Sequence, residues 1–173
     1  FRRLIAAVAL CASMSVHAAP GDLDTSFGAG TGKVLMSIGL SDDWSRGMAL
    51  QPDGRIVLAG TCTGGFCLVR YLANGALDTS FGTGGKVSTA IGSQAVAYAV
   101  AVQPDGKIVA AGPCIGASNP DFCLARYHAD GALDTSFGTD GKVISEISSG
   151  WDFVNAMVLQ SDGKIVVAGT CRN

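Results

Sequence analysis

The sequence predicts an all-β protein, built as an incomplete β-propeller-like array of four-stranded antiparallel meander blades. Two repeated markers carry this prediction. A stretch of the form Leu-Asp-Thr-Ser-Phe-Gly begins at residues 23, 77 and 133. The turn Gln-Pro-Asp-Gly begins at residues 51 and 103, and its variant Gln-Ser-Asp-Gly begins at residue 160. Self-similarity over this length is typical of repeat architectures, in which each unit stacks on its neighbours.

Short apolar runs rich in β-branched residues fill the space between these markers. In the first unit they cover residues 34–38, 47–50, 56–61 and 66–71. Runs of this length, bounded by Gly, Pro, Asp or Asn, are typical of strands and too short for helices. Gly54 is suited to the left-handed position that closes a hairpin. Four strands in a row predict a meander, and radial stacking of meanders gives a propeller, with a β-solenoid as the alternative.

The repeated Asp-Thr-Ser-Phe-Gly segment has an explanation in local backbone chemistry. Asp24, Asp78 and Asp134 are placed to accept backbone N–H groups two residues further on, and the serine is suited to the same role. The phenylalanine that follows would then fill the gap between adjacent units. We interpret the segment as structural, and ligand binding is the alternative.

The motifs also resemble a known bacterial repeat. The segments Leu-Asp-Thr-Ser-Phe-Gly, Gln-Pro-Asp-Gly-Lys-Ile-Val and Phe-Cys-Leu-Ala-Arg-Tyr are similar to the delta-60 repeat, a propeller-type repeat of unassigned function, over about residues 21–173. This resemblance implies a secreted bacterial protein built of repeats. It implies no activity.

Residues 1–18 have the pattern of a secretory signal peptide. Two arginines form a positive start, an apolar stretch follows, and Val16-His17-Ala18 supplies the small residues of a cleavage site. The apolar stretch is shorter than the roughly 20 residues that span a bilayer. We therefore expect cleavage before Ala19 and no membrane span.

Residues 19–173 are then expected to form a partial propeller of two full repeats and a truncated third. The third unit has the first cysteine of its pattern, Cys171, but neither the second cysteine nor the strand that carries it. We therefore expect further repeats of the same chain to follow Asn173 and to be its packing partners.

The cysteines after the leader recur at equivalent places. Cys62 and Cys67 flank a short loop between two predicted strands, and Cys114 and Cys123 occupy the same places in the second unit. Residues that face each other at the neck of a hairpin are close enough for a disulfide, and export favours oxidation. A zinc site is the alternative, but the cysteine spacing is irregular for one. We predict the disulfides Cys62–Cys67 and Cys114–Cys123, with Cys171 unpaired.

The motifs favour a non-catalytic protein without cofactor or metal. The sequence has no Gly-x-Ser-x-Gly elbow, Walker loop, dinucleotide fingerprint, His-Glu-x-x-His pair or Asp-x-Asp-x-Asp-Gly calcium loop. His128 is interpreted as solvent-facing, because Leu72 takes its place in the first unit. A net charge of −2 without a basic stripe argues against nucleic acid as a partner.

Two pairs of residues remain open as candidates for binding. Arg70 and Arg126 recur in the last strand of their units, where an ion pair with the aspartate of the next turn is the alternative to a ligand-facing guanidinium. Trp44 and Trp151 are expected in the polar connection between the first two strands of a unit. Aromatic rings on loop tips stack on sugars or anchor a partner, and the alternative is a ring that caps its own blade.

The leading function hypothesis is a secreted or periplasmic repeat scaffold that binds a protein or glycan through loops of the propeller face. The alternative is an exported enzyme with its active residues in blades or domains outside this chain.

Overall fold

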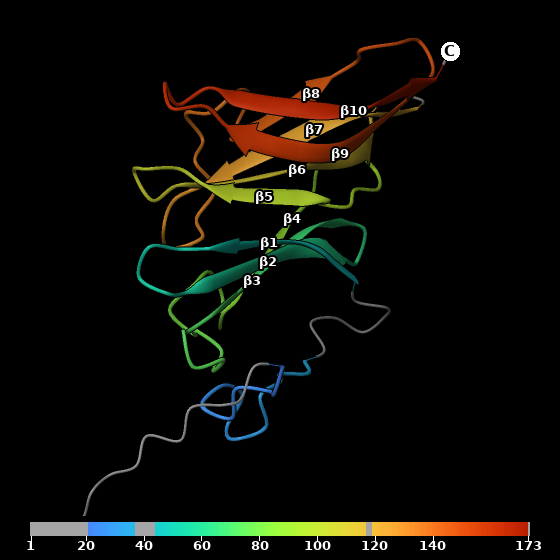
Figure 1. Ribbon diagram of the computed structural model, residues 1–173. Coiled ribbons are helices and arrows are strands. Elements are labelled where there is room, and N and C mark those ends of the chain that lie inside the picture. Colours follow the sequence, from blue (N-terminus) through green and yellow to red (C-terminus); the bar gives the residue numbers. More distant parts are fainter. Residues whose placement is uncertain (1–20, 37–43, 117–118, 173) are drawn as a thin grey trace, which may run out of the picture.

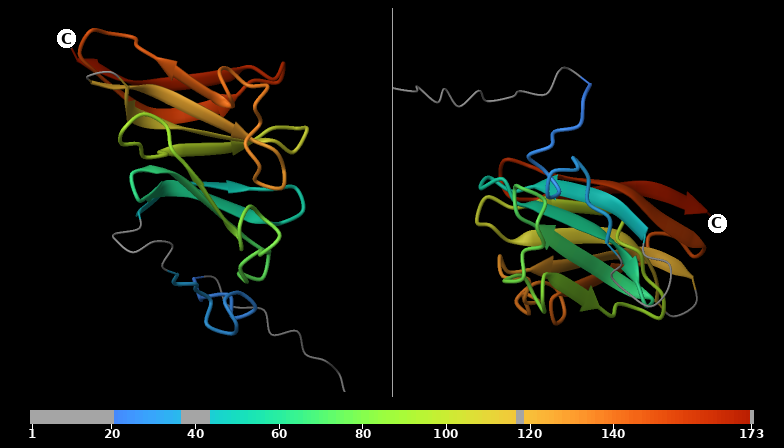
Figure 2. Two further views of the ribbon diagram at one scale, coloured as in Figure 1. Left: turned by 180° about the vertical axis from the view of Figure 1, so that it is seen from behind. Right: turned by 90° about the horizontal axis from the view of Figure 1, so that it is seen from below.

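Three antiparallel sheets stack on one another in the computed structural model, which describes residues 21–36, 44–116 and 119–172. Sheet 1 consists of β1 (Trp44–Leu50), β2 (Ile56–Cys62), β3 (Gly65–Tyr71) and β4 (Lys86–Thr89). Sheet 2 consists of β5 (Ala99–Val102), β6 (Ile108–Ile115), β7 (Pro120–Tyr127) and β8 (Lys142–Ser145). Sheet 3 pairs β9 (Trp151–Leu159) with β10 (Ile165–Arg172). Sheet 2 lies between the other two (Figures 1 and 2), and the described sheets form an open array, which confirms the predicted all-β class.

The predicted signal peptide, residues 1–18, lies outside the described residues. The described part of the chain contains no helix that is long and apolar enough to cross a membrane.

The structure corrects the phase of the predicted repeat. We expected residues 34–38 to form the first strand of a blade, but residues 34–36 form no strand, and the rest of that run lies outside the described residues. The strand that follows the Asp-Thr-Ser-Phe-Gly segment is instead the last strand of a sheet. The segment turns the chain back on itself, so that β4 pairs with β3 and Val87 lies opposite Leu68. Each four-stranded sheet therefore combines residues from two successive units of the sequence repeat.

The tight hairpins form as predicted. The Gln51 N–H donates to Arg55 O at 2.8 Å, and the Gly54 N–H donates to Gln51 O at 2.9 Å. Gly54 has a φ of 82°, which glycine adopts without strain. The third copy of the turn lacks the proline but keeps the bond, from Gln160 N–H to Lys164 O at 2.8 Å.

Two apolar cores hold the three sheets together. The core between sheets 1 and 2 is formed by buried residues of both, among them Val57, Phe66, Leu68, Phe81, Ile108, Ala110, Ala125 and Tyr127. The core between sheets 2 and 3 contains Val109, Ala111, Phe122, Leu124 and Val154. Strand β6 contributes to both cores, because its alternate side chains face sheets 1 and 3. Residues 108–111 therefore lie between two packed layers.

The sheets approach one another at the edge formed by β1, β5 and β9, which we call the inner strands. Strand β1 lies beside β5, and β5 lies beside β9 (Figure 1). The approach is close at Gly47 of β1, where an added Cβ atom would lie 3.2 Å from the backbone of Ala99 in β5. Glycine at this position lets the two backbones meet, and the first strands of successive sheets become neighbours.

Tyr127 of β7 joins sheet 2 to sheet 1. Its side chain is fully buried, and its hydroxyl donates to Thr89 Oγ1 of β4 at 2.9 Å. Burial raises the pKa of Tyr127 to about 12. Because an unfolded tyrosine ionises near pH 10, the stability contributed by this group is fully present below about pH 10 and is lost as the pH rises toward about 12.

We expect Tyr127→Phe to lower the free energy of unfolding by about 1 kcal/mol at neutral pH, because Thr89 loses a buried hydrogen-bond partner. The variant should also lose less stability than the wild type when the pH is raised from about 10 to about 12. Urea unfolding at a series of alkaline pH values measures both effects. Equal alkaline losses in the two proteins would contradict the assignment to Tyr127.

Candidate functional site

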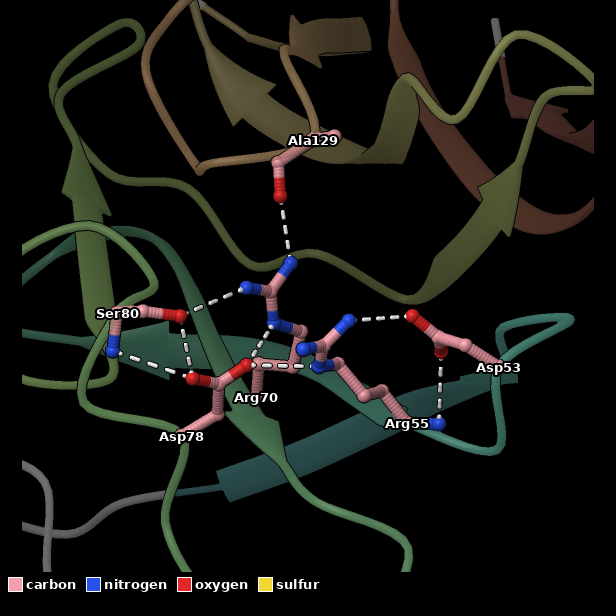
Figure 3. A network of polar contacts seen from close by, with 6 residues as sticks. All are labelled: Asp53, Arg55, Arg70, Asp78, Ser80 and Ala129. Atoms are coloured by element: carbon pink, nitrogen blue, oxygen red, sulfur yellow. Dashed lines mark hydrogen bonds and ion pairs between the residues drawn. The ribbon is translucent and has the colours of Figure 1, made fainter.

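A network of charged side chains surrounds the Asp-Thr-Ser-Phe-Gly segment of sheet 1 (Figure 3). Asp78 Oδ1 accepts hydrogen bonds from the Ser80 N–H at 3.1 Å and from Ser80 Oγ at 2.5 Å. Asp78 Oδ2 lies 2.8 Å from Arg70 Nε and 3.1 Å from Arg55 Nε. Arg55 pairs with Asp53, which lies in the same turn between β1 and β2. The aspartate therefore closes the predicted turn and also anchors two arginines.

Arg70 belongs to the framework of the fold. The residue is 5% exposed, and besides pairing with Asp78 it donates from Nη1 to Ala129 O at 2.5 Å. Ala129 lies in the loop between β7 and β8, so this bond connects sheet 1 to sheet 2. The guanidinium also lies over the ring of Phe81, 4.5 Å from its centre. These contacts confirm the ion-pair interpretation of Arg70.

Phe81 fills the gap between adjacent units, as predicted. Its side chain is fully buried, and an added Cβ atom at Gly131 would lie 2.9 Å from the ring. Beside the ring, the Gly82 N–H donates to Asp130 O at 2.7 Å, and Gly28 makes the equivalent bond one unit earlier at 2.9 Å. The repeated segment therefore joins successive units of the repeat, through the buried phenylalanine and through this backbone hydrogen bond.

The second copy of the network contains the one histidine of residues 19–173, His128. Asp134 Oδ2 lies 2.8 Å from Arg126 Nε and 3.2 Å from Lys107 Nζ, and Oδ1 lies 3.8 Å from His128 Nε2. Sequence reasoning missed this proximity of His128 to an aspartate. Ser136 Oγ donates to the carboxylate at 2.6 Å. In a catalytic triad the serine hydroxyl is hydrogen-bonded to the imidazole that acts as its base. Here the Ser136 hydroxyl donates to the carboxylate instead, so these groups are not arranged as a triad. His128 is half-exposed and solvent-facing, as interpreted.

Hydrogen bonds hold the pKa of both aspartates below the usual range. For Asp78 the largest cause is the bond from the Ser80 hydroxyl; burial opposes it, and the Ser80 N–H and Arg70 add to the lowering of the pKa. The pKa of Asp134 is lowered in the same way, first of all by Ser136. Both groups are ionised at neutral pH, which suits fixed anions in a framework and does not suit general acids.

Disulfide bonds Cys62–Cys67 and Cys114–Cys123 close the second hairpin of sheets 1 and 2, as predicted. The expected placement was wrong in one respect. We expected directly opposed partners, but in sheet 1 each cysteine lies opposite a glycine, and the bond crosses the ladder diagonally. The Cα–Cα separations of 5.7 and 5.8 Å allow this arrangement. Two such bonds indicate an oxidising environment outside the cytoplasm.

Cys171 is exposed and is a free cysteine among the described residues. A hydrogen bond to Asp152, a fully buried carboxylate, raises the pKa of the Cys171 thiol. A thiol with a raised pKa is a poor nucleophile and a poor metal ligand. Within residues 21–36, 44–116 and 119–172, no group of three or more His, Cys, Asp or Glu side chains is placed to hold a metal ion.

We expect removal of the Cys62–Cys67 bond by Cys62→Ser with Cys67→Ser to lower the free energy of unfolding by about 2 kcal/mol, because the bond closes a short loop. Urea unfolding measures the change, and Cys171→Ser is the control that should leave stability unaltered. Peptide mapping without reductant should recover Cys62 linked to Cys67. A link between Cys67 and Cys114 would show that both the pairing and the strand register are wrong.

The two tryptophans are the first residues of β1 and β9, so the prediction that both lie in connecting loops was wrong. The strands extend further toward the N-terminus than their apolar runs, because ladder pairing continues through the polar residues. Trp44 lies opposite Thr61, whereas Trp151 lies opposite Arg172. Both side chains are about half exposed, at 54% and 53%, and therefore lie on the surface at the start of an inner strand.

Trp44 belongs to a surface group of Trp44, Arg46 and Tyr98, which we call the aromatic–arginine cluster. The Arg46 guanidinium carbon lies 4.8 Å from the centre of the Trp44 ring and 5.5 Å from that of Tyr98. Trp44 and Arg46 are exposed, and Tyr98 is half-buried. Sequence reasoning missed the cluster, although Arg46 and Tyr98 share one signal: each stands five residues before the glutamine of the next turn. Trp151 instead packs edge-on against Phe153, with 6.1 Å between ring centres.

A groove of about 680 Å³ lies at the outer side of sheet 1, between the loop before β4 and residues 130–132 of the loop between β7 and β8. Hydroxyl side chains and backbone form much of its wall. Among the described residues that line it, none is aromatic and none is histidine. The aromatic–arginine cluster is therefore the stronger candidate for a binding surface.

Three segments of the chain match a family model described as "Domain of unknown function (DUF5122) beta-propeller", at residues 51–81, 103–137 and 160–172. Each segment begins at the glutamine of the repeated turn, and the first two end at the phenylalanine of the Asp-Thr-Ser-Phe-Gly segment. The match confirms the propeller type expected from the resemblance, and the delta-60 name remains a prediction. No curated protein matches the chain.

Proposed function

Because three segments between residues 51 and 172 match a β-propeller domain model, we propose that the chain is a non-catalytic repeat scaffold that binds a glycan or a protein outside the cytoplasm. Secretion or a periplasmic location agrees with the two disulfides and with the predicted leader. The ligand is held at the start of the inner strands rather than by connecting loops. The aromatic–arginine cluster is the main contact, and Trp151 is a second exposed ring on the same set of strands.

The observation that carries this proposal is the exposure of the cluster. Trp44 is about half exposed, at 54%, although large aromatic rings usually contribute their area to a core. Trp, Tyr and Arg are also the residues that contribute most to binding energy when they lie on a surface. The recurring charged groups Arg70 and Asp78 are occupied in joining sheets, which supports a scaffold over an enzyme.

The test is retention of the full chain on a panel of immobilised polysaccharides and cell-envelope proteins. We expect the wild type to bind at least one of them and Trp44→Ala to bind about tenfold more weakly. Trp151→Ala, which removes an equally exposed ring outside the cluster, should lose less. Equal retention of wild type and Trp44→Ala would contradict the proposal, and release of shortened polysaccharide would support an enzyme instead.

A further inference from the structure

The three inner strands share a β-bulge at the same place. In β1 the register shifts at Arg46, and in β9 it shifts at Asn155. In sheet 2 the extra residue falls just before β5, because the five residues 95–99 lie opposite the four residues 111–114. Tyr98 stands five residues before the turn glutamine, as do Arg46 and Asn155. These three residues, which we call the bulge row, therefore occupy equivalent positions.

The backbone at the bulge is fixed in all three sheets by a glycine on the neighbouring strand. An added Cβ atom at Gly60, Gly112 and Gly169 would lie 1.7, 1.9 and 1.9 Å from the carbonyl oxygens of Trp44 in β1, Val96 just before β5 and Phe153 in β9. No side chain fits at these distances, so each sheet needs glycine and keeps the same local backbone. Bulges re-aim a side chain, often beside a functional site. The fold thus presents one side chain from each sheet on the same local backbone conformation.

The residues of the bulge row differ from sheet to sheet, whereas those of the framework recur. Arg70 and Asp78 return as Arg126 and Asp134, because the same ion pair is needed in each sheet. The bulge row instead presents an arginine, a tyrosine and an asparagine. A position that is constant in backbone and variable in side chain is suited to recognising successive parts of an extended ligand.

The chemistry of the row is that of a surface for a sugar carrying an acidic group. The Arg46 guanidinium lies beside two aromatic rings, and none of the ion pairs found among the described residues involves it. The planar fork of arginine matches a carboxylate with two parallel hydrogen bonds. Flat aromatic faces such as those of Trp44 and Tyr98 accept the apolar face of a sugar ring. Asn155 is exposed; its Nδ2 donates to Thr170 Oγ1 at 3.2 Å, and its amide oxygen is the group that would accept from sugar hydroxyls.

The shape and charge of the surface favour a glycan over other polymers. The cavity beside Trp44 has a volume of only about 20 Å³, which is room for about one water molecule. Anchor side chains of protein partners fill desolvated pockets, and this cavity is too small for one. Nucleic acid is disfavoured by the net charge of −2.

We propose that the bulge row, together with Trp44, binds an extended glycan with carboxylate groups, and that one carboxylate pairs with Arg46. This inference rests on the proposed function and names its ligand class. The sugar rings stack on Trp44 and Tyr98, and the carboxylate accepts two parallel hydrogen bonds from the Arg46 guanidinium. Asn155 binds the glycan where it crosses sheet 3.

The test is calorimetric titration of the full chain with an oligogalacturonate and with its fully methyl-esterified form, which has the same rings without charge. We expect the acid to bind about tenfold more tightly than the ester. Arg46→Gln should abolish this preference and keep the weaker binding of the ester. Arg46→Lys should restore only part of it, because an ammonium group lacks the fork. Lys164→Gln, which removes an equally positive but remote side chain that is 74% exposed, is the matched control and should keep the full preference.

The outcomes separate this inference from the proposed function. Equal binding of acid and ester, both weakened by Trp44→Ala, would overturn the carboxylate inference and leave the scaffold proposal standing. Loss of the preference in Lys164→Gln as well would show unspecific charge attraction and overturn the role of Arg46. If polyglutamate binds more tightly than oligogalacturonate and this binding depends on Arg46, the ligand class is an acidic protein segment and not a glycan. Binding of none of these probes by the wild type would overturn the inference, and the polysaccharide and protein panel would then decide the proposed function alone.

Discussion

Replacement of Asp78 by asparagine should lower the free energy of unfolding by about 3 kcal/mol or more, because it leaves the buried Arg70 guanidinium without its ion-pair partner. The matched control is Asp53→Asn in the same network. The Asp53 side chain is 48% exposed and pairs with the half-exposed Arg55, so its removal should cost less than about 1 kcal/mol. Urea unfolding at neutral pH measures both variants. Equal small losses would mean that Arg70 is solvated and does not join the sheets.

The same aspartate gives the protein an expected acid sensitivity. The pKa of Asp78 is lowered in the folded protein, so its contribution is fully present above the unfolded value near 4 and is lost as the pH falls through the folded value. The wild type should therefore lose more stability on acidification than Asp78→Asn does. Urea unfolding at a series of acidic pH values compares the two slopes, and parallel curves would contradict the assignment.

Replacement of Phe81 by alanine should lower the free energy of unfolding by about 3–5 kcal/mol, because it opens a cavity between sheets 1 and 2. The ring also supports the guanidinium of Arg70. Phe137→Ala is the matched control from the next copy of the segment. Its ring is only half-buried, and its loss should cost about 1–2 kcal/mol.

Urea unfolding gives the size of the effect, and hydrogen exchange shows its location. In Phe81→Ala the exchange should increase in residues 128–132, where Gly82 bonds to Asp130. An increase confined to sheet 1 would show that the phenylalanine serves its own sheet and does not link two sheets.

The local elements of this fold are predictable from sequence because their chemistry is local. The hydrogen bond from the Ser80 N–H to Asp78, and the positive φ of Gly54, both follow from residue types within one turn. The phase of the blade does not follow in this way. Whether residues 86–89 pair with the strand before or after them depends on where the intervening segment directs the chain, and the order of apolar runs is the same in either case.

The candidate site was only partly predictable for a similar reason. The cysteine pairs were found from recurrence, but their diagonal placement depends on a register that recurrence does not give. Trp44 was found as an unusual residue, whereas Arg46 and Tyr98 were missed. Their meeting requires two neighbouring sheets and a bulge in each inner strand, and neither feature has a residue signature at the bulge itself. The glycines opposite the bulge, such as Gly60, are the signal that comes closest.

The most direct test of this account is the urea unfolding of Arg46→Gln measured beside that of Asp78→Asn. The recurring framework is expected to supply stability, and the exposed side chains at the inner strands are expected to supply ligand binding. We therefore expect a loss below about 1 kcal/mol for Arg46→Gln, which gives up only exposed contacts with two rings, against about 3 kcal/mol or more for Asp78→Asn. A loss in Arg46→Gln as large as that in Asp78→Asn would show that the cluster caps the sheets, and the surface would then belong to the framework.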